Sequence, residues 1–168
     1  MENARYETLI KTAKIAVLIA AASALQCLEA PIAAAFPWVK VGLANILTLY
    51  AVIRLSASEA ILIAAGRTFL SALILGSLFT PFHFMSFSGA VSSAVLMAFL
   101  HKAAPKISLS LKSIFGAVAS NSAQLLAISF LFKAKINLYW YFGAAILFSV
   151  PAGLLNAKIT EKLLQADG

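Results

Sequence analysis

Charged residues are scarce in this sequence. Only 11% of the 168 residues are charged, 62% are hydrophobic, and the mean hydropathy is +0.94. A soluble domain is usually about one-quarter charged, so this chain has too few charges to cover a water-facing surface. The sequence therefore predicts an integral membrane protein. Its net charge of +7 does not indicate nucleic-acid binding, because the basic residues fall between apolar segments, where they meet membrane lipid headgroups.

The scarcity of carboxylates argues against catalysis. Asp167 is the only aspartate, and no two acidic residues are neighbours on one predicted helix face. Diphosphate chemistry through magnesium needs clustered carboxylates, and acid–base catalysis needs a suitable pair of titratable groups. His83 and His101 lie at opposite ends of one apolar segment, and the single cysteine, Cys27, excludes a cysteine-based metal cluster. No phosphate-binding P-loop motif occurs. We therefore expect no enzyme activity, no metal and no cofactor.

Six segments approach the roughly twenty apolar residues that a membrane helix needs. They cover residues 9–28, 39–55, 57–79, 82–100, 109–132 and 138–158. Glu29, Pro31 and Pro37 are expected to end the first segment, because proline cannot donate a helical hydrogen bond. Pro151 and Gly153 are expected to kink the sixth. The sequence predicts one all-α domain over residues 1–168, a bundle of six transmembrane helices.

The distribution of Lys and Arg predicts the orientation of the bundle. Nine basic residues lie on the side of the N-terminus, whereas Lys40, Lys133 and Lys135 lie on the opposite side. Because cytosolic loops carry the excess of basic residues, both termini are predicted to be cytosolic. The N-terminal stretch is expected to be a retained cytosolic end and not a signal peptide.

Several polar residues inside the apolar segments are placed to converge near the outer half of the bundle. A cation, amides, hydroxyls and an aromatic ring there can wall a cavity for a small ligand with an anionic or polar head. The candidate ligand-binding residues are Lys40, Asn45, Arg67, His83, Ser86, Ser88, Asn121, Gln124 and Trp140.

Most of these residues also have a structural interpretation. Lys40 can extend to lipid headgroups, and Trp140, between Tyr139 and Tyr141, is typical of an aromatic belt at the membrane interface. Asn45 and the pair Asn121 and Gln124 can form hydrogen bonds between helices. His83 follows a proline turn and can lie in a hydrated loop.

Of the candidates, Arg67 is the most costly to place inside a membrane. An arginine near the middle of a span costs at least about 2.5 kcal/mol on insertion scales, so it is expected to face the bundle or a watery cavity. Glu29 is a possible partner, although it is expected nearer the outer surface. A structural ion pair and an anion-binding role both remain open.

The first segment carries small residues at a helical spacing. Ala16, Ala20 and Ala24 recur every fourth residue and form a smooth stripe on which another helix can lie closely. Packing within the bundle is the alternative to docking of a partner.

Short motifs across nearly the whole chain resemble one known family. They are the run from Lys40 to Asn45, Gly66-Arg67, Gly76-Ser77, and Phe87 to Ala90 with Met97. Together they resemble the Gx transporter family, catalogued as heptaprenyl diphosphate synthase component I, which is similar to the substrate-binding S components of energy-coupling-factor (ECF) transporters.

The resemblance implies a prokaryotic, multi-pass protein of the inner (cytoplasmic) membrane that binds a vitamin-like or precursor molecule from outside. It implies docking through Ala16, Ala20 and Ala24 onto a transmembrane T component driven by two ATPases. It also implies that the loop at 30–39 covers the ligand. The catalogued name points to prenyl diphosphate synthesis, for which this chain lacks the required aspartate-rich motif.

The leading hypothesis is therefore an S-component-like subunit that takes up a small molecule with an anionic group, powered by a separate ECF module. The alternative is a membrane anchor or regulatory subunit of an isoprenoid, quinone or redox assembly that transports nothing. A membrane-embedded enzyme is a third hypothesis, disfavoured by the missing carboxylates.

Overall fold

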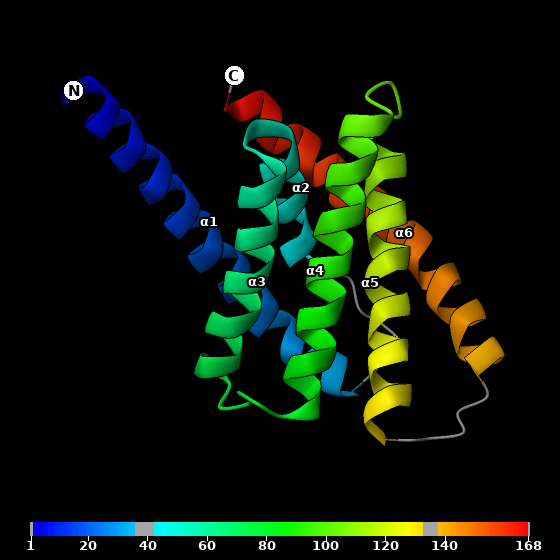
Figure 1. Ribbon diagram of the computed structural model, residues 1–168. Coiled ribbons are helices and arrows are strands. Elements are labelled where there is room, and N and C mark those ends of the chain that lie inside the picture. The colour runs from blue at the N-terminus through cyan, green and yellow to red at the C-terminus, as the bar shows by residue number, and fades with distance from the viewer. Residues whose placement is uncertain (1, 36–41, 133–137, 168) are drawn as a thin grey trace.

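In the described residues, five α-helices pack around a short central one, α2 (Ala44–Arg54) (Figure 1). The computed structural model describes residues 2–35, 42–132 and 138–167, and all regular secondary structure in these ranges is helical. In lipid, a helix is the arrangement in which an isolated segment satisfies its own backbone hydrogen bonds. The helices are α1 (Glu2–Ala35), α2 (Ala44–Arg54), α3 (Ala57–Ile74), α4 (Pro81–Ala103), α5 (Leu109–Phe132) and α6 (Leu138–Ala166).

Five of these helices are long and apolar enough to cross a membrane, which confirms the all-α membrane bundle. The exception is α2, whose 11 residues span only about 16 Å against a hydrocarbon core of about 30 Å. Helix α2 begins at Ala44, later in the chain than the predicted start at residue 39. Gly42 has a φ of 69°, in the left-handed region, so a regular helix cannot run through it.

The predicted end of the first helix is wrong. Helix α1 continues through Pro31 to Ala35, and it also begins earlier than predicted, at Glu2. A proline removes one backbone donor, but membrane helices tolerate this where neighbouring groups compensate. At the other end, residues such as Ala4, Glu7 and Lys11 are good helix formers that extend the helix.

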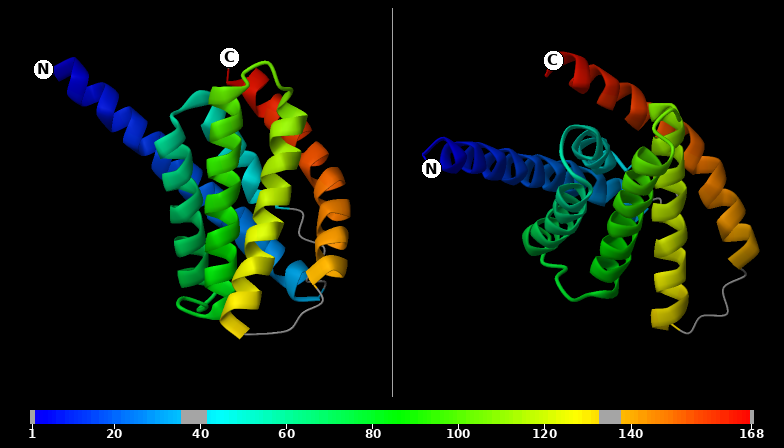
Figure 2. Two further views of the ribbon diagram at one scale, coloured as in Figure 1. Left: turned by 45° about the vertical axis from the view of Figure 1, so that its right-hand side comes forward. Right: turned by 45° about the horizontal axis from the view of Figure 1, so that its top comes forward.

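Two further boundaries differ from those predicted. Helix α3 ends at Ile74 and not at 79, because Gly76 and Phe79 have φ angles of 63° and 62°. Helix α6 continues to Ala166, and Figure 2 shows that it bends along its length, with Pro151 inside it.

Helix α2 lies at the centre of the bundle and contacts each of the other five helices. Most of its side chains are buried, and Leu49, Tyr50, Ala51 and Val52 form part of the main apolar cluster. Its partners in that cluster include Leu18 of α1, Ile63 of α3 and Met97 of α4. The shortest helix therefore anchors the core.

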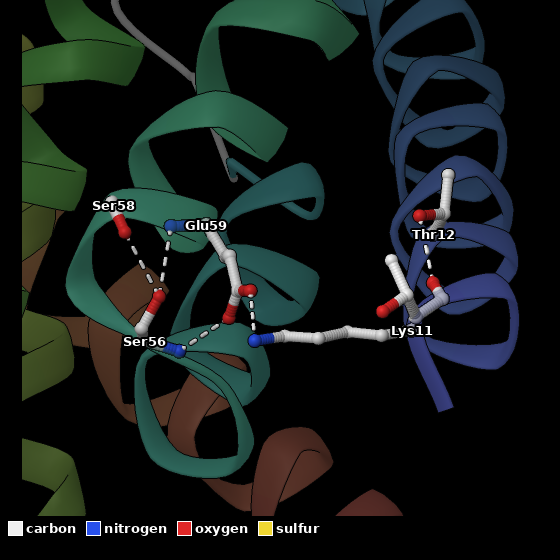
Figure 3. Close-up of polar contacts among 6 residues, drawn as sticks. Lys11, Thr12, Ser56, Ser58 and Glu59 are labelled. Atoms are coloured by element: carbon white, nitrogen blue, oxygen red, sulfur yellow. Dashed lines mark hydrogen bonds and ion pairs between the residues drawn. The ribbon is translucent and has the colours of Figure 1, made fainter. Parts of the chain in front are cut away.

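The N-terminal part of α1 extends away from the bundle (Figures 1 and 2). Lys11 in this part forms an ion pair with Glu59, whose carboxylate also accepts a hydrogen bond from the backbone N–H of Ser56 (Figure 3). Ser56 in turn caps α3 by accepting from the N–H of Glu59. One carboxylate thus caps α3 and ties it to α1.

Both termini lie at the same end of the bundle (Figure 1). There Asp167 accepts a hydrogen bond of 2.6 Å from the hydroxyl of Tyr50 and pairs with Lys14 and Arg54. Helices α1, α2 and α6 are joined at this end by a single carboxylate.

Gly153 allows α6 to approach α5 closely, so its substitution should destabilise the bundle. A Cβ atom at Gly153 would lie 2.7 Å from Cα of Ile114, whereas one at Gly143 would meet nothing within 4 Å. We expect Gly153→Ala to lower the free energy of unfolding by about 1–3 kcal/mol through overpacking. Gly143→Ala, in the same helix, should be neutral or stabilising. Thermal unfolding in mild detergent measures both variants, and equal unfolding temperatures would refute the close contact.

Candidate functional site

A cavity with polar walls lies where five helices meet. It has a volume of about 40 Å³, enough for roughly three ordered waters or a ligand group of a few heavy atoms. Ser86 and Ala90 place it in the first half of α4, which begins at the end of the bundle opposite the termini (Figure 1). The lining residues are Gln26, Glu29, Gly42, Asn45, Arg67, Ser86, Ala90, Ala117, Ser120, Asn121 and Gln124.

Arg67 brings a full positive charge to this cavity from the middle of α3. Its side chain is buried, with 5% of its surface exposed. Nη2 donates to Oδ1 of Asn45 at 2.6 Å, and Nη1 donates to Oε1 of Gln26 at 3.3 Å. Its Nε has no hydrogen-bond partner among the described residues. The guanidinium therefore contacts neutral amide oxygens on two helices.

Close packing of α1 on α3 fixes the position of Arg67. The hydroxyl of Ser23 donates to the backbone carbonyl of Arg67 at 3.1 Å. Next to it, a Cβ atom at Gly66 would lie 2.9 Å from Cδ1 of Ile19, so the glycine lets the two helices approach. The motif Gly66-Arg67 thus combines a packing residue with a polar one.

Glu29 brings the opposite charge to the same cavity. Its Oε1 accepts a hydrogen bond of 2.9 Å from the backbone N–H of Leu43, just before the first residue of α2. The N-terminus of a helix carries a partial positive charge that favours a carboxylate. Glu29 and Arg67 do not form a direct ion pair, since none of the ion pairs found in the described part of the chain joins them.

Helices α4 and α5 form the opposite wall. Ser86 accepts a hydrogen bond of 2.9 Å from Nε2 of Gln26, which links α4 to α1. Gln124 lies against Gly89, where a Cβ atom would be only 2.6 Å from its Nε2. Gln124 also donates to the hydroxyl of Ser120, one turn earlier, at 3.0 Å. The absence of a side chain at Gly89 therefore makes room for an amide at the cavity wall.

Helix α6 supports the site through hydrogen bonds to α5 and to the start of α2. Asn121 donates to the hydroxyl of Ser149 at 2.8 Å. Asn156 donates to the carbonyl of Gly42 at 3.1 Å, and Thr160 donates to the carbonyl of Ile46 at 3.3 Å. Three polar side chains of α6 thus hold Asn121 and the start of α2.

Five of the predicted binding residues do line the cavity, namely Asn45, Arg67, Ser86, Asn121 and Gln124. Two others do not. Ser88 donates to the carbonyls of Met85 and Ala123 instead, because two residues along a helix turn the side chain about 200° from Ser86. His83 lies almost a turn before Ser86, close to the first residue of α4, and its ring packs on those of Phe84 and Phe87. Lys40 and the side chain of Trp140 lie outside the described residues.

Sequence reasoning missed Gln26 and Ser120 as cavity residues and considered Glu29 only as a partner of Arg67. A signal was available, since Gln26 and Glu29 are three residues apart and share one face of α1. Ser120 and Gln124 share a face of α5 in the same way. The alanine stripe is on the surface, because Ala16, Ala20 and Ala24 are all exposed.

These observations define a class of protein, a multi-pass helical membrane protein with a small polar cavity inside its apolar bundle. Within that class, the chain belongs to the family described as heptaprenyl diphosphate synthase component I, whose model matches residues 18–163. No curated protein and no solved structure matches the chain. The family description agrees with the name given by the sequence motifs.

The hydrogen bond between Asn45 and Arg67 should contribute more to the free energy of unfolding than a hydrogen bond between two neutral groups in the same site. Asn45→Ala leaves a buried charged donor without its acceptor, so we expect a loss of about 1.5–3 kcal/mol in the free energy of unfolding. Asn121→Ala, which removes a neutral bond to Ser149, should cost about 0.5–1.5 kcal/mol. Thermal unfolding of the two variants compares these losses. Equal destabilisation would contradict a charged interaction at Asn45.

Proposed function

We propose that this chain is the substrate-binding subunit of a membrane uptake system, similar to the S components of ECF transporters. Its ligand is a small vitamin-like or isoprenoid- or quinone-related precursor with an anionic group. The observation that carries this proposal is the buried guanidinium of Arg67, which lines a polar cavity and bonds to neutral amide oxygens.

The energetics of a buried arginine support an anionic partner. A charge at mid-span is costly, and such residues in membrane proteins usually pair with one another or mark a ligand pathway. Asn45 and Gln26 satisfy part of the donor capacity of Arg67 but neutralise none of its charge. A carboxylate or phosphate of the ligand supplies a directly bonded anionic partner, because a guanidinium can donate two parallel hydrogen bonds to such a group.

The size of the cavity limits what it holds. About 40 Å³ suits a compact polar head and not a whole prenyl chain or ring system. We therefore assign the cavity to the head of the ligand. A larger ligand requires a conformation in which the bundle opens further.

The carboxylates argue for binding without catalysis. Glu29 is the one acidic residue that lines the cavity. Asp167, the only aspartate, lies beyond the end of α6 and is engaged with Tyr50, Lys14 and Arg54. Magnesium-dependent diphosphate chemistry needs several carboxylates together, and this site provides one.

The uptake model includes a partner in the membrane. The exposed Ala16, Ala20 and Ala24 leave a smooth surface on α1, which suits close helix packing against a T component that carries two ATPases. The excess of Lys and Arg at the end that holds the termini favours a cytosolic position for both termini. The cavity then lies in the outer half of a prokaryotic cytoplasmic membrane.

The family description favours a second candidate function, a membrane component that anchors or regulates a heptaprenyl diphosphate synthase. On this hypothesis the polar cavity is a structural network, and a soluble synthase co-purifies with the chain. Ligand retention and partner identity separate the two candidates.

The proposal predicts that Arg67 retains a small molecule through purification. Native mass spectrometry of the protein in mild detergent should show a bound species that is lost in Asn45→Asp. This variant keeps the side-chain volume but places a carboxylate 2.6 Å from Nη2, so it competes with the anionic group of the ligand.

Ser129→Ala is the control for the ligand experiment, because Ser129 lies outside the cavity lining and, among the described residues, bonds to a carbonyl of its own helix. It should leave the bound species unchanged. A bound species that persists in Asn45→Asp would refute the anionic contact, and a co-purifying soluble synthase without ligand would support the second candidate.

The exposed alanines predict a docking surface that a large residue blocks. Ala20→Leu should reduce recovery of a co-expressed T component in affinity purification at least tenfold, because the leucine prevents close helix approach. Ala21→Leu is the matched control, since Ala21 is also exposed on α1 but lies outside the stripe. Equal recovery of the partner with both variants would refute docking through the stripe.

A further inference from the structure

Two opposite charges face the same cavity without touching each other. Glu29 reaches it from α1 and Arg67 from α3, and both are at least nine-tenths buried. The ion pairs found among the described residues join other partners, Lys11 with Glu59 and Asp167 with Lys14 and Arg54. Among the described residues, each of the two charges forms hydrogen bonds with neutral groups only, while Glu29 acts on Arg67 electrostatically without direct contact.

Within the described part of the chain, the carboxylate of Glu29 has acceptor positions to spare. An ionised carboxylate offers about four acceptor positions, and the bond from the N–H of Leu43 uses one of them. The partial positive charge at the start of α2 lies next to this carboxylate. This carboxylate lines a cavity whose other described lining residues, apart from Arg67 and Gly42, carry amides, hydroxyls or small apolar side chains.

Gln26 links the two charges structurally. It lies one turn before Glu29 on α1, and its Oε1 accepts from Nη1 of Arg67. Its Nε2 donates to Ser86, which fixes the direction of the amide. Gln26 therefore bonds to Arg67 from the same face of α1 that carries Glu29.

From this arrangement we infer that the ligand is a zwitterion, with an anionic group at Arg67 and an ammonium or similar cationic group at Glu29. The inference rests on the proposed binding function and specifies the substrate class. A simple anion in this cavity would be repelled by Glu29, and a simple cation would be repelled by Arg67. A molecule with both charges gains an attractive partner at each end and is repelled at neither.

Matched probes test this inference on the purified full-length protein in mild detergent. β-Alanine, propionate and propylamine share one chain length, and γ-aminobutyrate, butyrate and butylamine form a series one carbon longer. Ligand-detected NMR gives the dissociation constants. We expect one of the two zwitterions to bind at least tenfold more tightly than the singly charged molecules of its series.

Glu29→Gln provides the selective variant, because glutamine can still accept from Leu43 but carries no charge. It should abolish the preference for the zwitterion and leave binding of the monoanion equal or stronger. An unchanged preference in Glu29→Gln, or a wild-type protein that prefers propionate or butyrate, would overturn the zwitterion inference and leave the anion-binding function in place.

If none of these probes binds, native mass spectrometry of the unliganded preparation decides. A retained small molecule with both a cationic and an anionic group supports the inference. A retained anion without a cationic group overturns the inference alone. Absence of any retained molecule, with no probe bound, overturns both the inference and the proposed function.

Discussion

The structure depends on one constraint, the need to solvate a guanidinium inside an apolar bundle. Arg67 cannot be left without acceptors at that depth, because each unsatisfied polar group there costs several kcal/mol. Asn45 of α2 and Gln26 of α1 supply oxygen atoms, and Gln26 extends the network to Ser86 of α4. The same contacts that solvate the arginine therefore draw four helices around one point and leave a polar cavity between them.

The short second helix is also stabilised by polar side chains of its neighbours. Starting α2 inside the bundle exposes backbone groups that would be costly in lipid. Glu29 accepts from the N–H of Leu43, and Asn156 donates to the carbonyl of Gly42. These side chains come from α1 and α6, so the backbone outside the helix at Gly42 and Leu43 is bonded by protein groups and not left exposed to lipid.

Small residues complement the polar ones throughout the bundle. Gly66 lets α1 approach α3 beside Arg67, Gly89 makes room for the amide of Gln124, and Gly153 brings α6 against α5. In a membrane, helices associate through close packing and interhelical hydrogen bonds, since lipid is as apolar as their side chains. Two of these glycines, Gly66 and Gly89, therefore lie directly beside polar residues of the site, Arg67 and Gln124.

The amino-acid sequence by itself determined the all-helical membrane bundle, because hydropathy and segment length are local properties that need no knowledge of packing. It also identified Asn45, Arg67, Asn121 and Gln124 as unusual, since polar groups inside apolar spans are costly wherever they lie. Only the tertiary structure decided which polar residues share a cavity. Ser86 enters it and Ser88 does not, because helix rotation and neighbouring helices determine the direction of each side chain.

The continuation of α1 through Pro31 and the start of α2 at Ala44 also became visible only in the structure. The same holds for the separation of Glu29 from Arg67. Proximity in the sequence cannot show that one carboxylate caps the start of α2 while the guanidinium bonds to amides. That distribution depends on the relative positions of α1, α2 and α3, which are determined by packing over the whole bundle.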